Sequence, residues 1–174
     1  GERTVALAQQ ARMKNPESGY DPLLEERMRA VLPICASKGI KIITVDSDLT
    51  GNETHRDLGV LACDFDTMGD FLIEQMGAIM NYEGKFAILS ATTDAPNQNK
   101  WIKGMQAAIK NPKYAKMQLV DVVYGDDKDQ KSLTEAEALL TKHPDLKGII
   151  APTTVGVYGC AKAVEQAGVY PGGK

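Results

Sequence analysis

The stretch "KFAILSATTDAPNQNKWIKGM", Lys85–Met105, contains the pattern that decides the fold. It starts with an apolar run of strand length and continues with the polar residues "SATTDAPNQN". From Pro96 onward, apolar residues recur at the spacing of one helix face, at Trp101, Met105 and Ala108. A strand, a polar turn and a helix in this order form the repeating unit of a parallel sheet.

The same order recurs along most of the chain. Apolar runs predict strands at residues 41–45, 57–65, 85–89, 117–124 and 146–151. Helical patterns predict helices at residues 21–38, 67–82, 96–110, 132–143 and 155–168. In the first helix, Asp21 is the expected N-cap, and Pro33 should bend or interrupt the helix. The alternation predicts an α/β fold, in which helices sandwich a parallel sheet as in a Rossmann-like lobe.

Ligands of such sheets bind beyond the carboxyl ends of the strands. Polar side chains follow three of the predicted strands: Asp46, Ser47 and Asp48; Ser90, Thr92, Thr93 and Asp94; Thr153 and Thr154. Because they include no nucleophile–base pair and no phosphate loop, we expect a binding edge without catalytic residues. Asp46 either caps a turn or accepts hydrogen bonds from two hydroxyls of a polyol.

The start of the predicted helix at residues 96–110 allows two interpretations. Asp94 is explained fully as a helix cap, whereas Asn97 and Gln98 are first-turn residues on the inward face. Their amides offer donors and acceptors together, which complements the hydroxyls of a sugar, so both are candidate ligand contacts. Trp101 is expected in the core, with a sugar-stacking platform as the alternative.

Several kinds of site are not expected. The net charge of −3, with basic residues spread among the acids, argues against a nucleic-acid partner. The three cysteines have no metal-ligand spacing, so we expect neither a metal nor a cofactor, and Cys160 should be a buried small hydrophobe. The segment 124–130, "YGDDKDQ", lacks calcium-loop spacing and should be a solvated turn. His55 and His143 lie in exposed-looking loops, away from the carboxyl end of any strand.

Four longer segments carry a family resemblance: "KGIKIITVDSD", "EGKFAILSATTDAPNQNKWIKGM", "NPKYAKMQLVDVVYGDD" and "HPDLKGIIAPTTVGVYG". They resemble type I periplasmic solute-binding proteins, nearest to the rhamnose-type sugar receptors and the autoinducer receptors of ABC importers. The resemblance implies two α/β lobes that close on a monosaccharide or a related small polyol without performing chemistry. It also implies a membrane permease partner and a periplasmic location, although the amino end shows no signal peptide.

The resemblance also implies particular ligand contacts. The strand-end aspartate of the family falls on Asp46, its paired polar residues fall on Asn97 and Gln98, and its second-lobe strand-end contacts fall on Pro152 and Thr154. Autoinducer receptors have Asp and Ala in place of Asn97 and Thr154, so these two residues favour the rhamnose-like branch.

We expect an incomplete version of the two-lobe architecture. Residues 1–63 would be a remnant of the first lobe, with residues 1–30 unassigned, and residues 64–174 the second lobe without its last strand. Such a chain should bind sugar weakly or not at all by itself, and its exposed sheet edges could drive dimerisation. Two alternatives stay open: the effector-binding core of a sugar-responsive repressor, and a small α/β sugar-processing enzyme.

Overall fold

The structure, a computed structural model, describes residues 22–46 and 53–168 and divides the chain into two compact units. The first unit comprises residues 1–62 and the second residues 63–174. This division lies one residue from the expected boundary, and the assignment of the units to two lobes stays a prediction. Within the described ranges, no helix combines the length and the apolar character needed to span a bilayer.

The described part of the first unit contains one long helix and a small parallel sheet. Its described elements are α2 (Pro22–Ser37), β1 (Ile43–Val45), η1 (Glu53–His55) and β2 (Leu58–Val60). The two strands pair in parallel, with Ile43 opposite Leu58 and Val45 opposite Val60. Helix α2 continues through Pro33, so the proline does not interrupt it. The expected cap Asp21 and the strand-end residues Ser47 and Asp48 lie outside the described residues.

The second unit contains every predicted strand and helix from residue 67 onward, with boundaries shifted by a few residues. Its elements are α3 (Met68–Ile79), β3 (Gly84–Ser90), α4 (Pro96–Ala108), η2 (Pro112–Tyr114), β4 (Met117–Tyr124), α5 (Asp129–Lys142), β5 (Leu146–Ile150) and α6 (Thr154–Ala167). The three strands are parallel and lie in the order β4-β3-β5. The predicted α/β fold is therefore confirmed.

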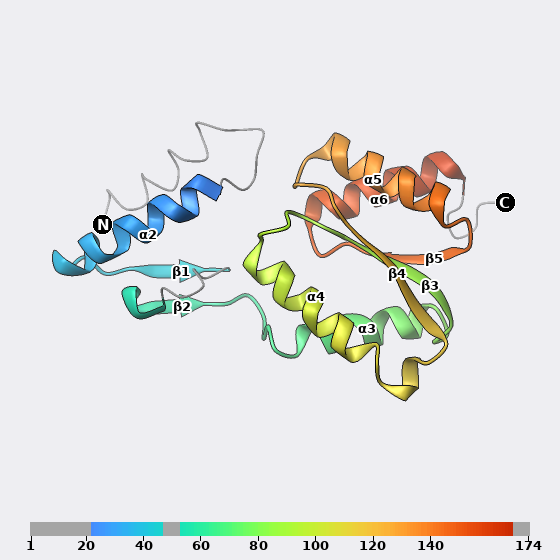
Figure 1. The fold of residues 1–174 in the computed structure, drawn as a ribbon, viewed down its shortest axis with the longest axis horizontal. Helices are drawn as coiled ribbons and strands as arrows, with labels where there is room; N and C mark the ends of the chain where they lie inside the picture. Colours follow the sequence, from blue (N-terminus) through green and yellow to red (C-terminus); the bar gives the residue numbers. More distant parts are fainter. Residues whose placement is uncertain (1–21, 47–52, 169–174) are drawn as a thin grey trace. The chain divides into compact units, whose positions relative to one another are not determined.

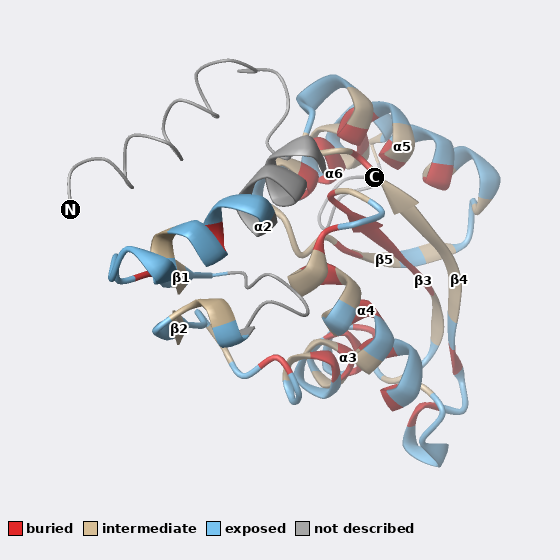
Figure 2. Ribbon diagram, turned by 60° about the vertical axis from the view of Figure 1, so that its left-hand side comes forward, coloured by how far each residue is buried: buried red, intermediate tan, exposed pale blue. Residues whose placement is uncertain are grey.

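The central strand β3 divides the core of the second unit into two layers. Helices α3 and α4 cover one face of the sheet, and α5 and α6 cover the other (Figure 1). Side chains alternate along β3, so Phe86 and Ile88 pack against α3 and α4, whereas Leu89 packs against α5 and α6. The strand is buried from Phe86 to its end, as Figure 2 shows.

The contact between α3 and α4 depends on two glycines. A Cβ placed on Gly69 would lie 2.5 Å from the Cα of Gly104, which is too close for any real carbon atom. Without side chains at these positions, the two helix backbones can approach each other directly. Hydrogen bonds from Ser90 and Ala91 to Gln98 join the start of α4 to the end of β3, where the candidate site lies.

Candidate functional site

The turns that follow β3, β4 and β5 lie together at one edge of the sheet, because the three strands are parallel. We call this region the carboxyl edge and define it as residues 90–98, 125–128 and 151–154. The helices that leave β3 and β5 cover opposite faces of the sheet. In parallel α/β sheets such a divergence opens a crevice between neighbouring strand ends, which is where ligands bind.

Gln98 is the most firmly held of the predicted contact residues. Its side chain is only 7% exposed, and its Oε1 accepts hydrogen bonds from the Ser90 hydroxyl at 2.6 Å and the Ala91 N–H at 2.8 Å. The amide nitrogen donates to no partner among the described residues. One side of the amide therefore fixes Gln98 to the end of β3, and the other side keeps two donors that a ligand could use.

Asn97, and not the predicted cap Asp94, accepts a hydrogen bond from an N–H group in the first turn of α4. The N-cap of α4 is Ala95, and no side chain caps the helix from that position, so the cap interpretation of Asp94 is wrong. Asp94 is exposed. Instead, Oδ1 of the half-buried Asn97 accepts a hydrogen bond of 2.8 Å from the Gln98 N–H, one of the free donors in the first turn. Because Pro96 has no N–H, the first donors to satisfy lie further along the helix.

Trp101 packs into the core only in part. It is half-buried, and its ring meets that of Phe65 edge-on with centroids 5.5 Å apart. Met105 and Ala108, which share its predicted face, are buried. The indole N–H is buried without a hydrogen-bond partner among the described residues.

The segment after β4 is a turn, as predicted, but only part of it is exposed. Asp126 and Asp127 are half-buried, and both adopt left-handed backbone conformations, with φ of 54° and 50°. The Asp126 carboxylate forms an ion pair with Lys131 at 2.6 Å, and the Asp127 carboxylate accepts a hydrogen bond from the Thr153 hydroxyl. The available signal was a pair of aspartates, which tolerate the left-handed region, directly after a predicted strand.

The turn after β5 supplies the last two predicted residues of the second unit. Pro152 is half-buried, and Thr154 is the exposed first residue of α6. The N-cap, Thr153, forms no side-chain bond to the helix, and its hydroxyl donates to Asp127. The carboxyl edge thus holds Asn97, Gln98, Pro152 and Thr154 on neighbouring turns, while their contact with a ligand stays a prediction.

Asp46 belongs to the first unit. It follows β1 directly, its backbone N–H donates to the Val60 carbonyl at 2.8 Å, and its φ of 69° is left-handed. Its side chain is exposed. The position at a strand end agrees with the sequence analysis, and the role of Asp46 in binding stays a prediction.

Both histidines are more buried than expected. His55 and His143 are half-buried, and Nε2 of His143 lies 3.5 Å from Oδ2 of Asp121. The hydrogen bond from Lys142 is the main cause that lowers the pKa of Asp121 from its usual value. His143 precedes β5, so it lies toward the opposite edge of the sheet from the candidate site.

A second polar cluster lies on the α3 side of the sheet. The Glu74 carboxylate accepts hydrogen bonds from Lys113 and from the hydroxyls of Tyr114 and Tyr82, each at 2.6–2.7 Å. These donors, Lys113 first, lower the pKa of Glu74 to about 2. The donors are side chains of η2 and of the segment before β3, so the cluster links these segments to α3.

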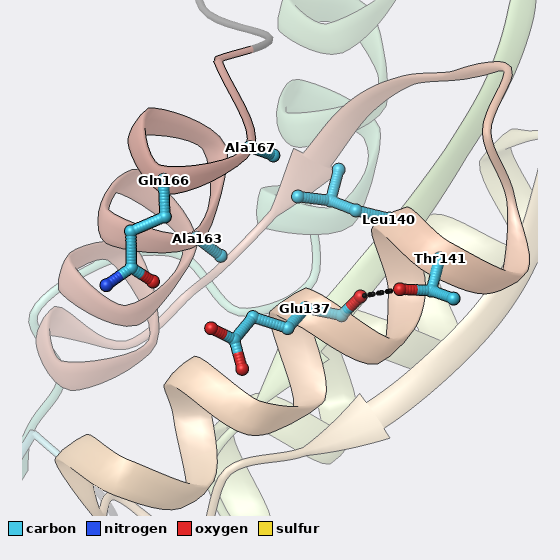
Figure 3. A pocket seen from close by; sticks show the side chains of 6 residues that line it. All are labelled: Glu137, Leu140, Thr141, Ala163, Gln166 and Ala167. Carbon is cyan, nitrogen blue, oxygen red and sulfur yellow. Dashed lines mark hydrogen bonds between the residues drawn. The ribbon is translucent and has the colours of Figure 1, made fainter.

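Two surface hollows lie away from the carboxyl edge. One, of about 330 Å³, is formed between α5 and α6 by Glu137, Leu140, Thr141, Ala163, Gln166 and Ala167 (Figure 3). These residues occupy the last turns of both helices, which run back from the carboxyl edge. The other, of about 690 Å³, runs along α3 beside Phe71 and Tyr114. Neither hollow includes a predicted contact residue.

The chain matches a known protein family and resembles several solved structures. The periplasmic binding protein domain matches residues 21–174. An ABC transporter solute-binding protein from Clostridium phytofermentas with bound L-rhamnose is 35% identical and superposes with a TM-score of 0.74. A sugar ABC transporter protein from Actinomyces odontolyticus is 40% identical, with a TM-score of 0.63. A solute-binding protein from Burkholderia graminis in complex with D-arabinose is 29% identical, with a TM-score of 0.71.

The chain spans less than half the length of these structures. The matches cover 80%, 78% and 78% of this chain but only 43%, 43% and 45% of the three solved chains, in the same order. The similarity therefore concerns a part of each relative.

Proposed function

This chain belongs to the periplasmic binding protein domain family, and we propose that it forms part of the sugar receptor of an ABC importer. The ligand would be a monosaccharide, with a rhamnose-like sugar favoured, held by hydrogen bonds between two lobes. The protein would bind and release this sugar without chemical change, outside the cytoplasmic membrane, and deliver it to a membrane permease.

The observation that carries the proposal is the arrangement of the carboxyl edge in a chain of this family. Gln98 is held by β3 through its oxygen and keeps its amide donors, while Thr154 presents a hydroxyl at the start of α6. Groups that both donate and accept are the complement of sugar hydroxyls. We assign Asn97, Gln98, Pro152 and Thr154 to the second-lobe side of the site and Asp46 to the first-lobe side.

Asn97 and Thr154 support the rhamnose-like branch of the proposal. In the autoinducer receptors, Asp and Ala are expected at these two positions, and an aspartate could not donate to a sugar oxygen as the Asn97 amide can. A relative with bound L-rhamnose is 35% identical to this chain in a match that covers 80% of the chain.

Isothermal titration calorimetry of the full-length protein with L-rhamnose and D-arabinose tests the proposal. We expect binding of at least one of these sugars, which should be recovered unchanged by NMR after incubation. Gln98→Glu is the sharpest variant, because it keeps the oxygen that accepts from Ser90 and Ala91 and replaces the amide donors with a charged carboxylate oxygen that cannot donate. It should weaken binding about 10- to 100-fold, the effect of losing a buried hydrogen bond.

Two results would contradict the proposal. Full-length protein that binds neither sugar would exclude a receptor for sugars of this kind, and recovery of a converted sugar would indicate an enzyme. Unchanged affinity in Gln98→Glu would remove Gln98 from the site while leaving the receptor function in place.

A further inference from the structure

The turn between β4 and α5 contains two consecutive left-handed residues, neither of them glycine. Asp126 and Asp127 have φ of 54° and 50°, a conformation that L-amino acids adopt only at a cost. Such a conformation persists where the surroundings hold it, and it is concentrated at functional sites. The turn lies at the carboxyl edge, beside the residues assigned to the sugar.

Three kinds of contact hold this turn in place: two backbone hydrogen bonds, an ion pair and a hydrogen bond between side chains. The N–H groups of Gly125 and Asp126 donate to the carbonyls of Ser90 and Ala91 at 2.9 and 2.8 Å, which ties the turn to the end of β3. Lys131 pairs with the Asp126 carboxylate at 2.6 Å. The third contact is the hydrogen bond between Asp127 and Thr153.

The third contact differs from the others because it crosses the sheet. Strands β4 and β5 flank β3, so the bond from Thr153 to Asp127 joins the two outer turns past the end of the central strand. A charged acceptor makes this hydrogen bond roughly twice as strong as a neutral one. The Thr153 hydroxyl uses its proton in this bond and forms no cap bond with α6.

The bond between Asp127 and Thr153 affects the position of the next residue, Thr154. Thr154 is the first residue of α6 and is exposed, and no side chain at the N-cap holds the start of this helix. Among the described residues, the Asp127 carboxylate is the side-chain group that forms a hydrogen bond to the turn between β5 and α6. A sugar that contacts Pro152 and Thr154 would therefore bind to a turn that is held by Asp127, a residue of the turn after β4.

We propose that Asp127 is a positioning residue of the sugar site, which holds Thr153 and thereby places Thr154 and the start of α6 against the ligand. This inference depends on the proposed function. It adds a residue that neither the sequence analysis nor the family resemblance assigned, on a turn that contributes no predicted contact.

The test uses the full-length protein and calorimetric titration with L-rhamnose. Asp127→Gly removes the carboxylate without backbone strain, because glycine adopts the left-handed conformation freely. Thr153→Val removes the hydroxyl at nearly constant volume, and Thr153→Ser retains the hydroxyl. We expect Asp127→Gly and Thr153→Val each to weaken binding about 10-fold, the double variant to be no weaker than the worse single one, and Thr153→Ser to stay within about 2-fold.

Asp126→Gly is the matched control, since it removes a carboxylate from the neighbouring left-handed position but leaves the Asp127–Thr153 bond intact. It should weaken binding by no more than about 2-fold, because only the partly exposed ion pair with Lys131 is lost. Equal weakening in Asp126→Gly would show a general loosening of the turn and overturn the inference, and so would additive losses in the double variant.

The inference and the proposed function fail in different ways. Wild-type protein that binds no sugar overturns the proposed function, and the inference falls with it. Wild-type protein that binds, together with unaffected Asp127→Gly and Thr153→Val variants, overturns the inference alone.

Discussion

The two units of this chain use similar strand sequences to very different effect. In the second unit, the apolar side chains of β3 are fully buried between two pairs of helices. In the first unit, the apolar side chains of β1 and β2 share one face of the sheet, and Ile43, Val45, Leu58 and Val60 are all between 46% and 68% exposed.

The difference shows that a strand pattern by itself does not produce a core. Burial of an apolar side chain contributes about 25 cal/mol per Å² only when a second layer removes it from water. The second unit has its three layers within residues 63–174, whereas the first unit has a two-stranded sheet. We therefore expect most of the stability of this chain to come from the second unit.

The largest expected effect comes from truncation of the central strand. Phe86→Ala should lower the free energy of unfolding of the second unit by about 3–5 kcal/mol, because a fully buried ring leaves a cavity. Val45→Ala, in the exposed strand β1, should change the free energy of unfolding by no more than about 0.5 kcal/mol. Urea denaturation followed by the fluorescence of Trp101, the single tryptophan, reports on the second unit. Similar losses for both variants would break the comparison.

A smaller effect is expected where α3 crosses α4. Gly69→Ala forces a Cβ against the backbone of Gly104 and should cost about 1–3 kcal/mol by overpacking. In Gly104→Ala the nearest atom is 3.1 Å away, and the helix preference of alanine offsets the tight contact, by about 1 kcal/mol. The midpoint of urea denaturation should therefore fall clearly for the first variant and little for the second. The reverse order would mean that the two helices cross differently.

A pH-dependent effect should arise from Glu74. Its pKa is lowered from 4.5 to about 2 in the folded protein, so its contribution to stability is fully present above pH 4.5. The contribution is lost as the pH falls from 4.5 toward 2, because the unfolded chain then binds the proton more readily. Glu74→Gln should flatten the thermal unfolding temperature over this range, and Tyr114→Phe should flatten it in part. An unchanged slope in Glu74→Gln would show that the cluster with Lys113 does not form in solution.

The smallest effect concerns reactivity and not stability. Burial raises the pKa of the Cys160 thiol to about 11, so at pH 8 only about one thiol in a thousand is ionised. Cys35, in the first unit, and Cys63, at the start of the second, are half-buried. Mass spectrometry after brief iodoacetamide treatment should show Cys160 as the last of the three to react, and unfolding in urea should remove the difference. Rapid labelling of Cys160 in the folded protein would indicate that α5 and α6 separate.

Much of the fold could be predicted from the sequence, because the periodicity of apolar residues is a local property. The strand at residues 117–124 has the predicted bounds, and the helix that begins at Pro96 starts where its sequence indicates. The same pattern placed Asn97, Gln98 and Thr154 beyond strand ends. The contacts within the turns could not be predicted. The N-cap is Ala95 and not Asp94, and the Gln98 side-chain oxygen accepts a hydrogen bond from Ser90 at the end of β3.

By itself, the sequence determined the order of strands and helices and the edge of the sheet at which a ligand would bind. Only the tertiary structure decided which polar groups satisfy one another and which remain free to bind. Asp127 and Thr153 lie 26 residues apart and meet because β4 and β5 flank β3. Strand order depends on how whole layers pack, and no local pattern of residues encodes it.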